Sequence, residues 1–311
     1  MNRGYLYIAI ATFFFSSMEI ALKIAGPLFH PVQITFLRFF IGSLLLMPLA
    51  FMNIKRRQIK LHAEDFRFYA GLGFLLVVVS MVLFQLAVVM GQPAVVAVLF
   101  CSNPVFVIIF AHFILGEAIT KYTVATLLIS TAGIVAIMDP TNMTGNVLSL
   151  VLVLISAVLF ALYGVLGAKR SLVHGGVTMT CFGFLFGSLE LMVLSQLTKI
   201  AAVDQYLREI GLTVFTNIPI CGGINLTSLP YLIYIGVGVT GLGFATYFLA
   251  MEATSATEAS LVFFIKPVVA PLMALFVLKE PITFNMIVGI ILIVVGSAIS
   301  FIPKLKKAKA V

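Results

Sequence analysis

Residues 103–120 read NPVFVIIFAHFILGEAIT, and residues 266–283 repeat their pattern as KPVVAPLMALFVLKEPIT. Each stretch has a proline at its second position and a glutamate at its fifteenth, so the two are in register at an offset of 163 residues. The same offset holds, without a gap, between residues 73–138 and residues 236–301. The chain is therefore a doubled unit of hydrophobic segments. Such duplications are typical of membrane proteins whose two halves enclose a pathway.

The composition requires a lipid bilayer around most of the chain. Of its 311 residues, 62% are hydrophobic and 10% are charged, which leaves too few polar side chains to cover a water-soluble domain. The net charge of +8 does not indicate nucleic-acid binding, because the basic residues cluster at the ends of apolar runs, as they do beside anionic lipid. Cys101, Cys181 and Cys221 form no even framework and are expected to be packing residues. We expect no nucleic-acid partner, no cofactor and no metal.

Ten segments are apolar over about 20 residues, the length that a helix needs to cross the hydrocarbon core. They are expected at residues 4–24, 31–52, 67–90, 94–115, 121–138, 146–168, 173–197, 228–251, 257–278 and 285–302. Most connections between them are too short for a soluble domain. Arg3 followed by an apolar run imitates a signal peptide, but the run continues through Glu19 and Lys23. It is therefore expected to be a retained first span.

The distribution of basic residues orients the spans. With a cytoplasmic N-terminus, the inside loops and tails contain thirteen of them: Arg3, Lys55, Arg56, Arg57, Lys60, Arg67, Lys121, Lys169, Arg170, Lys304, Lys306, Lys307 and Lys309. The outside loops contain three: Lys199, Arg208 and Lys279. Because basic residues concentrate in cytoplasmic loops, both termini are expected to be cytoplasmic.

A second offset relates spans two and seven, the second span of each unit. Residues 35–49 match residues 180–194 at an offset of 145, and the 18-residue difference from the main offset indicates an insertion around residues 198–227. This insertion is expected outside the membrane, as a loop elaboration in which a short surface helix can form.

Each unit contains five spans, so the second unit must enter the membrane from the opposite side. The predicted fold is an all-α polytopic membrane protein with ten transmembrane helices, arranged as two inverted five-helix repeats. The first repeat takes residues 1–138, the second takes residues 146–302, and a basic cytoplasmic tail takes residues 303–311. Inverted repeats can exchange conformations, which supplies inward-open and outward-open states from one sequence.

The five-plus-five layout, the doubled proline-to-glutamate block and the pair Arg38-Phe39 in span two together resemble the EamA branch of the drug/metabolite transporter superfamily. The resemblance covers essentially the whole chain. It implies a central cavity lined by spans from both halves, spans five and ten at the periphery, and transport of small metabolites such as amino acids, often outward. The tryptophan-glycine pair usual in span one is absent, and Phe15 and Ser16 occupy its neighbourhood. No particular substrate therefore follows from the resemblance.

Ionisable residues deep inside spans are the candidate site residues, because a charge near the bilayer centre costs several kcal/mol unless it is paired or hydrated. Lys266 is the deepest and precedes Pro267, which frees a backbone carbonyl and can open the helix toward a cavity. We expect Lys266 to bind a carboxylate or phosphate, or to titrate. The alternative is a buried ion pair with Glu19 or Glu190 that only holds helices together.

Glu19 and Arg38 lie at similar depth in adjacent antiparallel spans, so the two can pair. A free Glu19 would instead suit an amine or reversible protonation during transport. Arg38 is assigned a structural role, because the resemblance places a similar arginine in carriers of unlike cargo. Glu190 replaces the apolar Leu45 of its equivalent position, and this asymmetry leaves a structural role and a coupling role equally open.

Four further polar residues are expected to share the cavity: Gln85, Asn103, Tyr163 and Tyr247. Asn103 is the repeat equivalent of Lys266, and each precedes one of the paired prolines, Pro104 and Pro267, to which we assign a structural or coupling role. The pair of polar groups is expected to face each other across a pseudo-two-fold axis. Most of the 28 phenylalanines are expected to face lipid or fill the core, and not to form an aromatic cage.

These features predict a secondary transporter, not an enzyme, in a bacterial cytoplasmic membrane. It is expected to move a small polar metabolite, an amino acid or a related compound, by alternating access, with export as one direction. The alternative within transport is a carrier of organic cations or drug-like amines that uses Glu19. An intramembrane enzyme is the remote alternative, because the four histidines lack metal-ligand spacing and no two aspartates lie close together. The expected partners are the small molecule and the bilayer, and a homodimer through the peripheral spans is left open.

Overall fold

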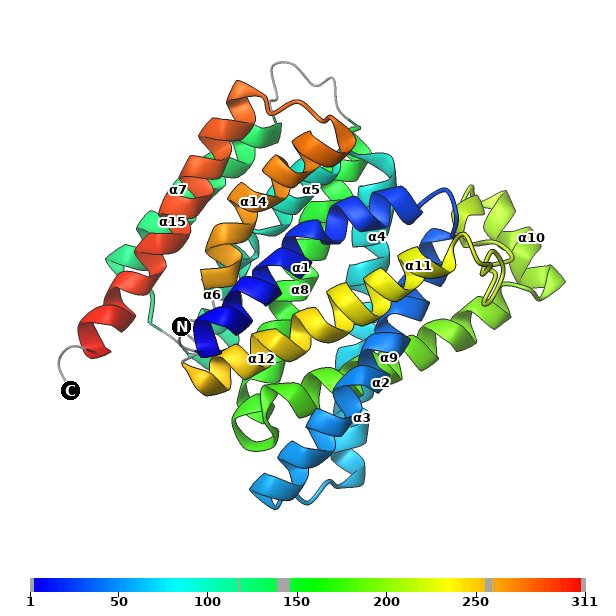
Figure 1. Ribbon diagram of the computed structural model, residues 1–311, viewed down its shortest axis with the longest axis horizontal. Coiled ribbons are helices and arrows are strands. Elements are labelled where there is room, and N and C mark those ends of the chain that lie inside the picture. Colours follow the sequence, from blue (N-terminus) through cyan, green and yellow to red (C-terminus); the bar gives the residue numbers. More distant parts are fainter. Residues whose placement is uncertain (1–2, 117, 139–145, 255–258, 260, 309–311) are drawn as a thin grey trace.

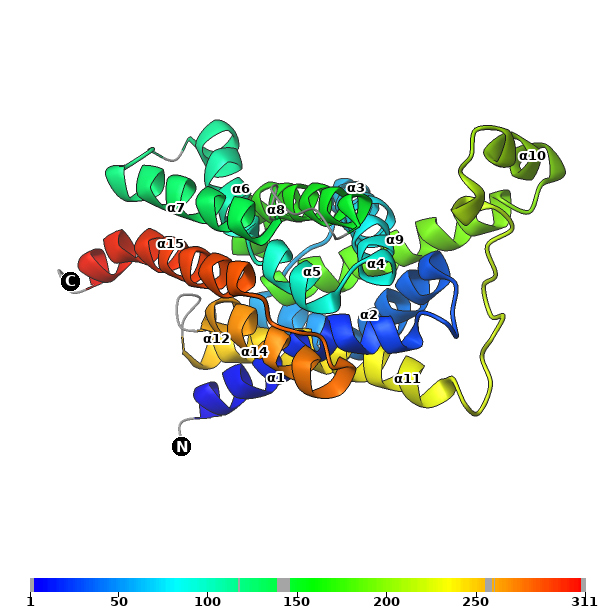
Figure 2. The same cartoon turned by 90° about the horizontal axis from the view of Figure 1, so that it is seen from above.

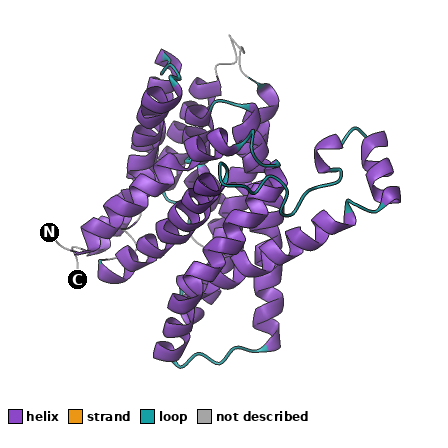
Figure 3. Cartoon of the chain, turned by 45° about the vertical axis from the view of Figure 1, so that its right-hand side comes forward, coloured by secondary structure: helices purple, strands orange, loops and turns teal. Residues whose placement is uncertain are grey.

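The computed structural model describes residues 3–116, 118–138, 146–254, 259 and 261–308. Within these residues every regular element is a helix, which confirms the predicted all-α class (Figure 3). The first half contains α1 (Arg3–Ala25), α2 (Pro31–Arg57), α3 (Ala63–Gly73), η1 (Phe74–Ser80), α4 (Met81–Met90), α5 (Pro93–Phe100), α6 (Asn103–Phe110), η2 (Ala111–Leu115) and α7 (Lys121–Met138). The second half contains α8 (Val147–His174), α9 (Gly176–Leu197), α10 (Ala201–Glu209), η3 (Thr213–Phe215), α11 (Leu229–Ile233), η4 (Tyr234–Leu242), α12 (Gly243–Ala253), α14 (Leu261–Leu278) and α15 (Phe284–Ala308).

Seven helical stretches in the described part of the chain are long and apolar enough to cross a membrane: Arg3–Ala25, Pro31–Arg57, Ala63–Met90, Pro93–Leu115, Val147–Ala168, Gly176–Leu197 and Leu229–Met251. Three further apolar helices are shorter: Val124–Met138, Ile265–Leu278 and Phe284–Gly296. The ten expected spans coincide with these ten stretches, but the crossing of the membrane by all ten stays a prediction. The last helix, α15, continues to Ala308 and so includes part of the predicted tail.

Helices α2 and α9 cross at the centre of the bundle, and α7 and α15 lie side by side at one edge (Figures 1 and 2). At the centre, the rings of Phe39 and Phe184 meet edge to face with centroids 4.7 Å apart. At the edge, the Thr126 hydroxyl donates a hydrogen bond to the Gly296 carbonyl at 2.9 Å. The edge position of α7 and α15 agrees with the peripheral spans that the resemblance implies.

Spans three and eight each contain a π-helical segment, η1 and η4. Residues 74–80, which form η1, correspond at the offset of 163 to residues 237–243, which overlap η4. Ser80, at the end of η1, donates a hydrogen bond to the Ser156 carbonyl on α8 at 2.9 Å. Each half thus contains a π-helical segment at an equivalent position of its sequence. Such segments are frequent at functional sites in helical proteins.

The two proline-containing spans differ in their course, although their sequences are equivalent. In the first half the helix stops after Phe100, and α6 begins at Asn103 with Pro104 in its first turn, where its missing N–H costs no hydrogen bond. In the second half, α14 continues through Pro267 and Pro271 as one helix. The first unit thus has a break at the depth where the second has a continuous helix.

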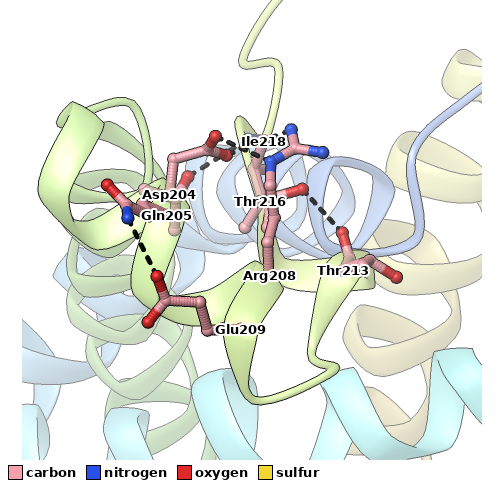
Figure 4. Close-up of polar contacts among 8 residues, drawn as sticks. Asp204, Gln205, Arg208, Glu209, Thr213, Thr216 and Ile218 are labelled. Carbon is pink, nitrogen blue, oxygen red and sulfur yellow. Dashed lines mark hydrogen bonds and ion pairs between the residues drawn. The ribbon is translucent and has the colours of Figure 1, made fainter.

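The predicted surface helix in the insertion is present as α10, and none of its residues is buried. Its side chains pair along the helix, with Asp204 and Arg208 joined at 2.8 Å and Gln205 donating to Glu209 at 2.8 Å (Figure 4). Figure 2 shows α10 projecting away from the bundle. The chain then returns to the α1–α2 connection, where the Gln33 amide donates hydrogen bonds to the carbonyls of residues 220 and 222. We call this end of the bundle the α10 end.

Candidate functional site

The centre of the bundle contains a buried ion pair between its two halves. Lys266 on α14 donates to Glu19 on α1, with Nζ and Oε1 2.7 Å apart. Only 3% of Lys266 and 1% of Glu19 are exposed. The structure thus brings together the two residues that the sequence ranked as substrate binders, in the paired arrangement that was the alternative for Lys266. The second carboxylate oxygen of Glu19 is buried and has no hydrogen-bond partner among the described residues.

Arg38 on α2 is fully buried beside this pair, but it does not contact a carboxylate in the described structure. Its two terminal nitrogens reach the sulfur atoms of Met18 and Met81, each at 3.5 Å. Its guanidinium carbon lies 4.4 Å from the centroid of the Phe39 ring, and its Nε has no partner among the described residues. No Glu19–Arg38 ion pair is formed among the described residues: Glu19 is hydrogen-bonded to Lys266 and acts on Arg38 only through its charge.

Arg38 and Lys266 line a cavity of about 50 Å³ at the centre of the bundle. One phenylalanine from each of seven helices, α1, α2, α5, α8, α9, α12 and α14, lines the same cavity. The rings are in contact with one another: Phe244 lies 4.9 Å from Phe15 and 5.0 Å from Phe184, and Phe100 lies 5.1 Å from Phe160, all measured between centroids. The prediction that most phenylalanines are lipid-facing or packing residues did not identify this aromatic wall.

The cavity is too small for a metabolite in this conformation. A volume of about 50 Å³ holds a few water molecules, since one water needs roughly 10–15 Å³. Sites for small molecules typically measure about 300–1,000 Å³. A bound metabolite therefore requires the phenylalanine rings to move apart, which makes this a closed conformation of the site.

Two other predicted residues lie just behind the cavity wall. The ring of Tyr247 on α12 packs 6.2 Å from Phe15 and 5.5 Å from Phe263, both of which line the cavity. Tyr163 on α8 is buried and packs 6.1 Å from the ring of Phe160. Both tyrosines therefore pack behind the residues that line the cavity, and their contact with a substrate stays a prediction.

The remaining predicted residues are not gathered around Lys266. Asn103 donates to the Phe100 carbonyl of its own span at 3.2 Å, since the helix restarts there, and it does not line the cavity. Gln85 on α4 is fully buried, and neither of its amide atoms has a hydrogen-bond partner among the described residues. Glu190 on α9 is half-buried, with one buried oxygen that has no partner in the described structure. The approach of Asn103 and Lys266 across an axis stays a prediction.

Polar contacts close the bundle at the α10 end. Lys23 on α1 donates to the carbonyls of Val89 at 2.7 Å and Gly91 at 2.8 Å, which ties α1 to the turn between α4 and α5. Glu280, just after α14, accepts a hydrogen bond from the Ala94 N–H at 3.2 Å and so caps α5. Burial raises the pKa of the Glu280 carboxyl above its ordinary value, although the Ala94 N–H and Lys23 oppose this shift.

A second polar network joins α2, α3, α8 and α9 at the opposite end, where Asp65, Arg170 and His174 also line an open pocket. Asp65 forms an ion pair with Arg170, and the Tyr69 hydroxyl lies 2.5 Å from Nδ1 of His174. Asn53 on α2 donates to the His174 carbonyl at 2.8 Å. The sequence interpretation did not select these residues. The sequence offered one signal for this network, because Asp65 is one of only eleven acidic residues in the chain.

The stability contribution of His174 depends on pH. Burial, followed by the positive charges of Arg170 and His62, lowers the pKa of His174 below its ordinary value of 6.5. Because the folded state resists protonation, this contribution is complete above pH 6.5 and is lost as the pH falls through the lowered pKa. The melting temperature of the purified wild-type protein should therefore fall between about pH 7.5 and 5.5. We expect this fall to be smaller in the His174→Asn variant. An equally steep fall in the variant would contradict this assignment.

Comparison with known proteins agrees with this architecture. The model of the EamA-like transporter family matches residues 2–138 and again residues 147–302. The chain is 34% identical over 309 residues to an uncharacterized transporter of Clostridium kluyveri, covering 97% of this chain and 94% of the relative. It is 26% identical over 294 residues to an uncharacterized transporter of Archaeoglobus fulgidus, covering 94% and 97%. A crystal structure with 17% sequence identity superposes with a TM-score of 0.64 over 96% of each chain, which shows a common fold.

Proposed function

Because this chain belongs to the EamA-like transporter family and is a multi-pass membrane protein, we propose that it is a secondary carrier that moves a small polar metabolite by alternating access. The observation that carries this proposal is the closed central cavity, which receives one phenylalanine from each of seven helices of both halves. The Lys266–Glu19 ion pair joins the halves beside it. We further propose a bacterial cytoplasmic membrane, with both termini cytoplasmic, on the distribution of basic residues.

Contacts between equivalent residues support two inverted repeats. Gly42 on α2 lies directly against Thr240 on η4, and Gly187 on α9 lies directly against Val77 on η1. Gly187 is the equivalent of Gly42 at the offset of 145, and Thr240 is the equivalent of Val77 at the offset of 163. Both contacts join the two halves, and the second repeats the first with the equivalent residues exchanged between the halves. The two separate matches to the family model, at residues 2–138 and 147–302, support the same division.

Alternating access requires that each end of the bundle can open in turn. In the closed conformation, Lys23 and Glu280 secure the α10 end, and Asp65, Arg170 and His174 secure the opposite end. Both sets are contacts between helices that can break without unfolding any helix. We propose that the carrier releases one set at a time, which exposes the central cavity to one side of the membrane.

The charges at the cavity favour a substrate with a carboxylate over a simple cation. Two basic side chains, Arg38 and Lys266, line the cavity, and the one carboxylate beside it, Glu19, is already bound to Lys266. An organic cation would have to displace Lys266 from Glu19 inside a site that already has excess positive charge. An amino acid or a related carboxylate-bearing metabolite therefore fits better.

The proposal predicts protein-dependent exchange in liposomes. Purified protein should be reconstituted into vesicles preloaded with unlabelled amino acids, organic acids or amines, and counterflow of the labelled compound should be recorded. We expect at least one carboxylate-bearing compound to accumulate transiently above the level in protein-free vesicles. Arg208→Ala, on the exposed helix α10, should leave this exchange unchanged and serves as a control for correct insertion. Absence of exchange for every compound, with correctly folded protein, would contradict the carrier function.

A further inference from the structure

Arg38 is a buried cation that forms no hydrogen bond or ion pair with a carboxylate in the described part of the chain. Only 1% of the residue is exposed, and among the described residues its guanidinium donates to two thioether sulfurs, of Met18 and Met81, at 3.5 Å. Thioethers are weak acceptors, and Nε has no partner among the described residues. A guanidinium stays charged in proteins, so burial of this side chain carries a desolvation cost, which the face of the Phe39 ring and the charge of the nearby Glu19 carboxylate offset only in part. A buried cation without a hydrogen-bonded anion indicates that the missing partner is a ligand.

The charges around the cavity do not balance within the protein. Lys266 and Glu19 neutralise each other across 2.7 Å, which leaves the charge of Arg38 as the excess at the cavity wall. Glu190 does not supply the missing anion, because it is half-buried on α9 and does not line the cavity. The site therefore carries one net positive charge that a ligand with one carboxylate would neutralise.

The geometry directs the guanidinium at the cavity. The Phe39 ring packs 4.4 Å from the guanidinium carbon, and the side chain itself lines the cavity. A guanidinium can hold a carboxylate through two parallel hydrogen bonds, which a methionine sulfur cannot offer. The rest of the wall is formed largely by phenylalanine rings, which suit an apolar or aromatic body.

On these grounds we propose that Arg38 is the anchor for the carboxylate of the transported metabolite, whose apolar or aromatic body lies among the phenylalanine rings. This inference rests on the proposed carrier function and narrows its substrate class. The sequence predicted that Lys266 binds the substrate carboxylate. We assign this role to Arg38 instead, because Lys266 is already paired with Glu19. The shared chemistry is a carboxylate on an apolar body, present both in a simple organic acid and in an amino acid with an apolar side chain.

Three probes that share a phenyl ring separate the charge types. They are 3-phenylpropionate as an anion, L-phenylalanine as a zwitterion and 2-phenylethylamine as a cation. Melting temperatures of the purified wild-type protein in lipid nanodiscs should rise with one or both carboxylates, because a ligand that binds the folded state stabilises it. A rise with 3-phenylpropionate alone identifies organic acids, and a rise with L-phenylalanine identifies amino acids. A rise with the amine alone, or no rise with either carboxylate, overturns the proposal.

Arg38→Met is the decisive variant, because it keeps an apolar stem of similar length and removes the unpaired charge. We expect its melting temperature without ligand to equal or exceed that of the wild type, while the carboxylate-induced rise disappears and carboxylate affinity falls at least about tenfold. Arg38→Lys keeps the charge but not the planar fork and should bind carboxylates with intermediate affinity. If Arg38 only holds helices together, Arg38→Met will melt at a lower temperature and retain the ligand-induced rise, which overturns the proposal.

The same samples distinguish this inference from the carrier function. Intact carboxylate binding without counterflow in the wild type would reject the carrier and leave the anchor. Counterflow that is unchanged by Arg38→Met would reject the anchor and leave the carrier.

Discussion

Replacement of Lys266 by alanine is expected to destabilise the protein by about 3 kcal/mol or more and to abolish transport. The substitution removes one partner of an ion pair whose members are 3% and 1% exposed, so the Glu19 carboxylate would remain buried without its hydrogen-bonded cation and would keep only the more distant charge of Arg38. Breaking a buried pair in this way costs about 3–5 kcal/mol, most of it for the charge left behind. The loss should appear as a large drop in the melting temperature in nanodiscs. The counterflow signal should be lost in the same variant.

A double-mutant cycle separates stability from transport at this pair. Glu19→Gln and Lys266→Met should each destabilise the protein, whereas the double variant, which leaves neither member of the pair without the other, should recover most of the lost stability. Transport should not recover, because the double variant still lacks the ion pair that joins the two halves beside the cavity. Lys199→Ala, at the exposed end of α9, is the control and should behave as the wild type. Wild-type transport in the double variant would assign the pair to packing alone.

Gly73→Ala is expected to have the second large effect, on stability. A β-carbon at Gly73 would overlap backbone atoms of Gly183 and Gly187 on α9, since the two helices touch through their backbones here. Backbone atoms cannot rotate away as a side chain can, so the helices would have to separate along their contact. Overpacking a core typically costs about 1–3 kcal/mol, and this rigid contact should reach the upper end of that range.

A neighbouring glycine in the same helix provides the matched control. Gly71 has no atom within 4 Å of the position where a β-carbon would stand. Gly71→Ala should therefore be neutral or should stabilise the protein by up to about 1 kcal/mol, the ordinary gain from alanine in a helix. Melting temperatures and the yield of monodisperse protein in detergent measure both variants. Equal behaviour of the two variants would mean that the close approach of α3 and α9 does not limit stability.

The fold class could be predicted from the sequence because its signals are local. Apolar runs of about 20 residues specify membrane helices wherever they occur, and a repeat at a fixed offset can be read along the chain. The short surface helix at α10 was likewise predicted from neighbouring residues and is present. The course of the equivalent spans could not be predicted in this way. The helix breaks after Phe100 but runs through Pro267, although both sequences contain the same proline.

The candidate site was predicted only as a set of residue types. Depth along a span identified Glu19, Arg38 and Lys266 as charges that need an explanation, and all three lie at the centre of the bundle. Depth alone could not tell which cation Glu19 contacts, because Arg38 and Lys266 both lie deep within their spans. Phenylalanines that line the cavity could not be told from those that face lipid, since a helix is apolar on both sides in a membrane.

By itself, the sequence determined that this protein is an all-helical, internally duplicated membrane protein with a few charges buried inside it, because hydrophobic length and repeat spacing are properties of the chain. The tertiary structure alone decided that Lys266 pairs with Glu19, that Arg38 bonds no carboxylate among the described residues and that seven helices each contribute a phenylalanine to one cavity. The physical reason is the separation along the chain of the groups that each interaction involves. Burial in lipid acts on each segment separately, whereas an ion pair forms only when two groups 247 residues apart come within 2.7 Å.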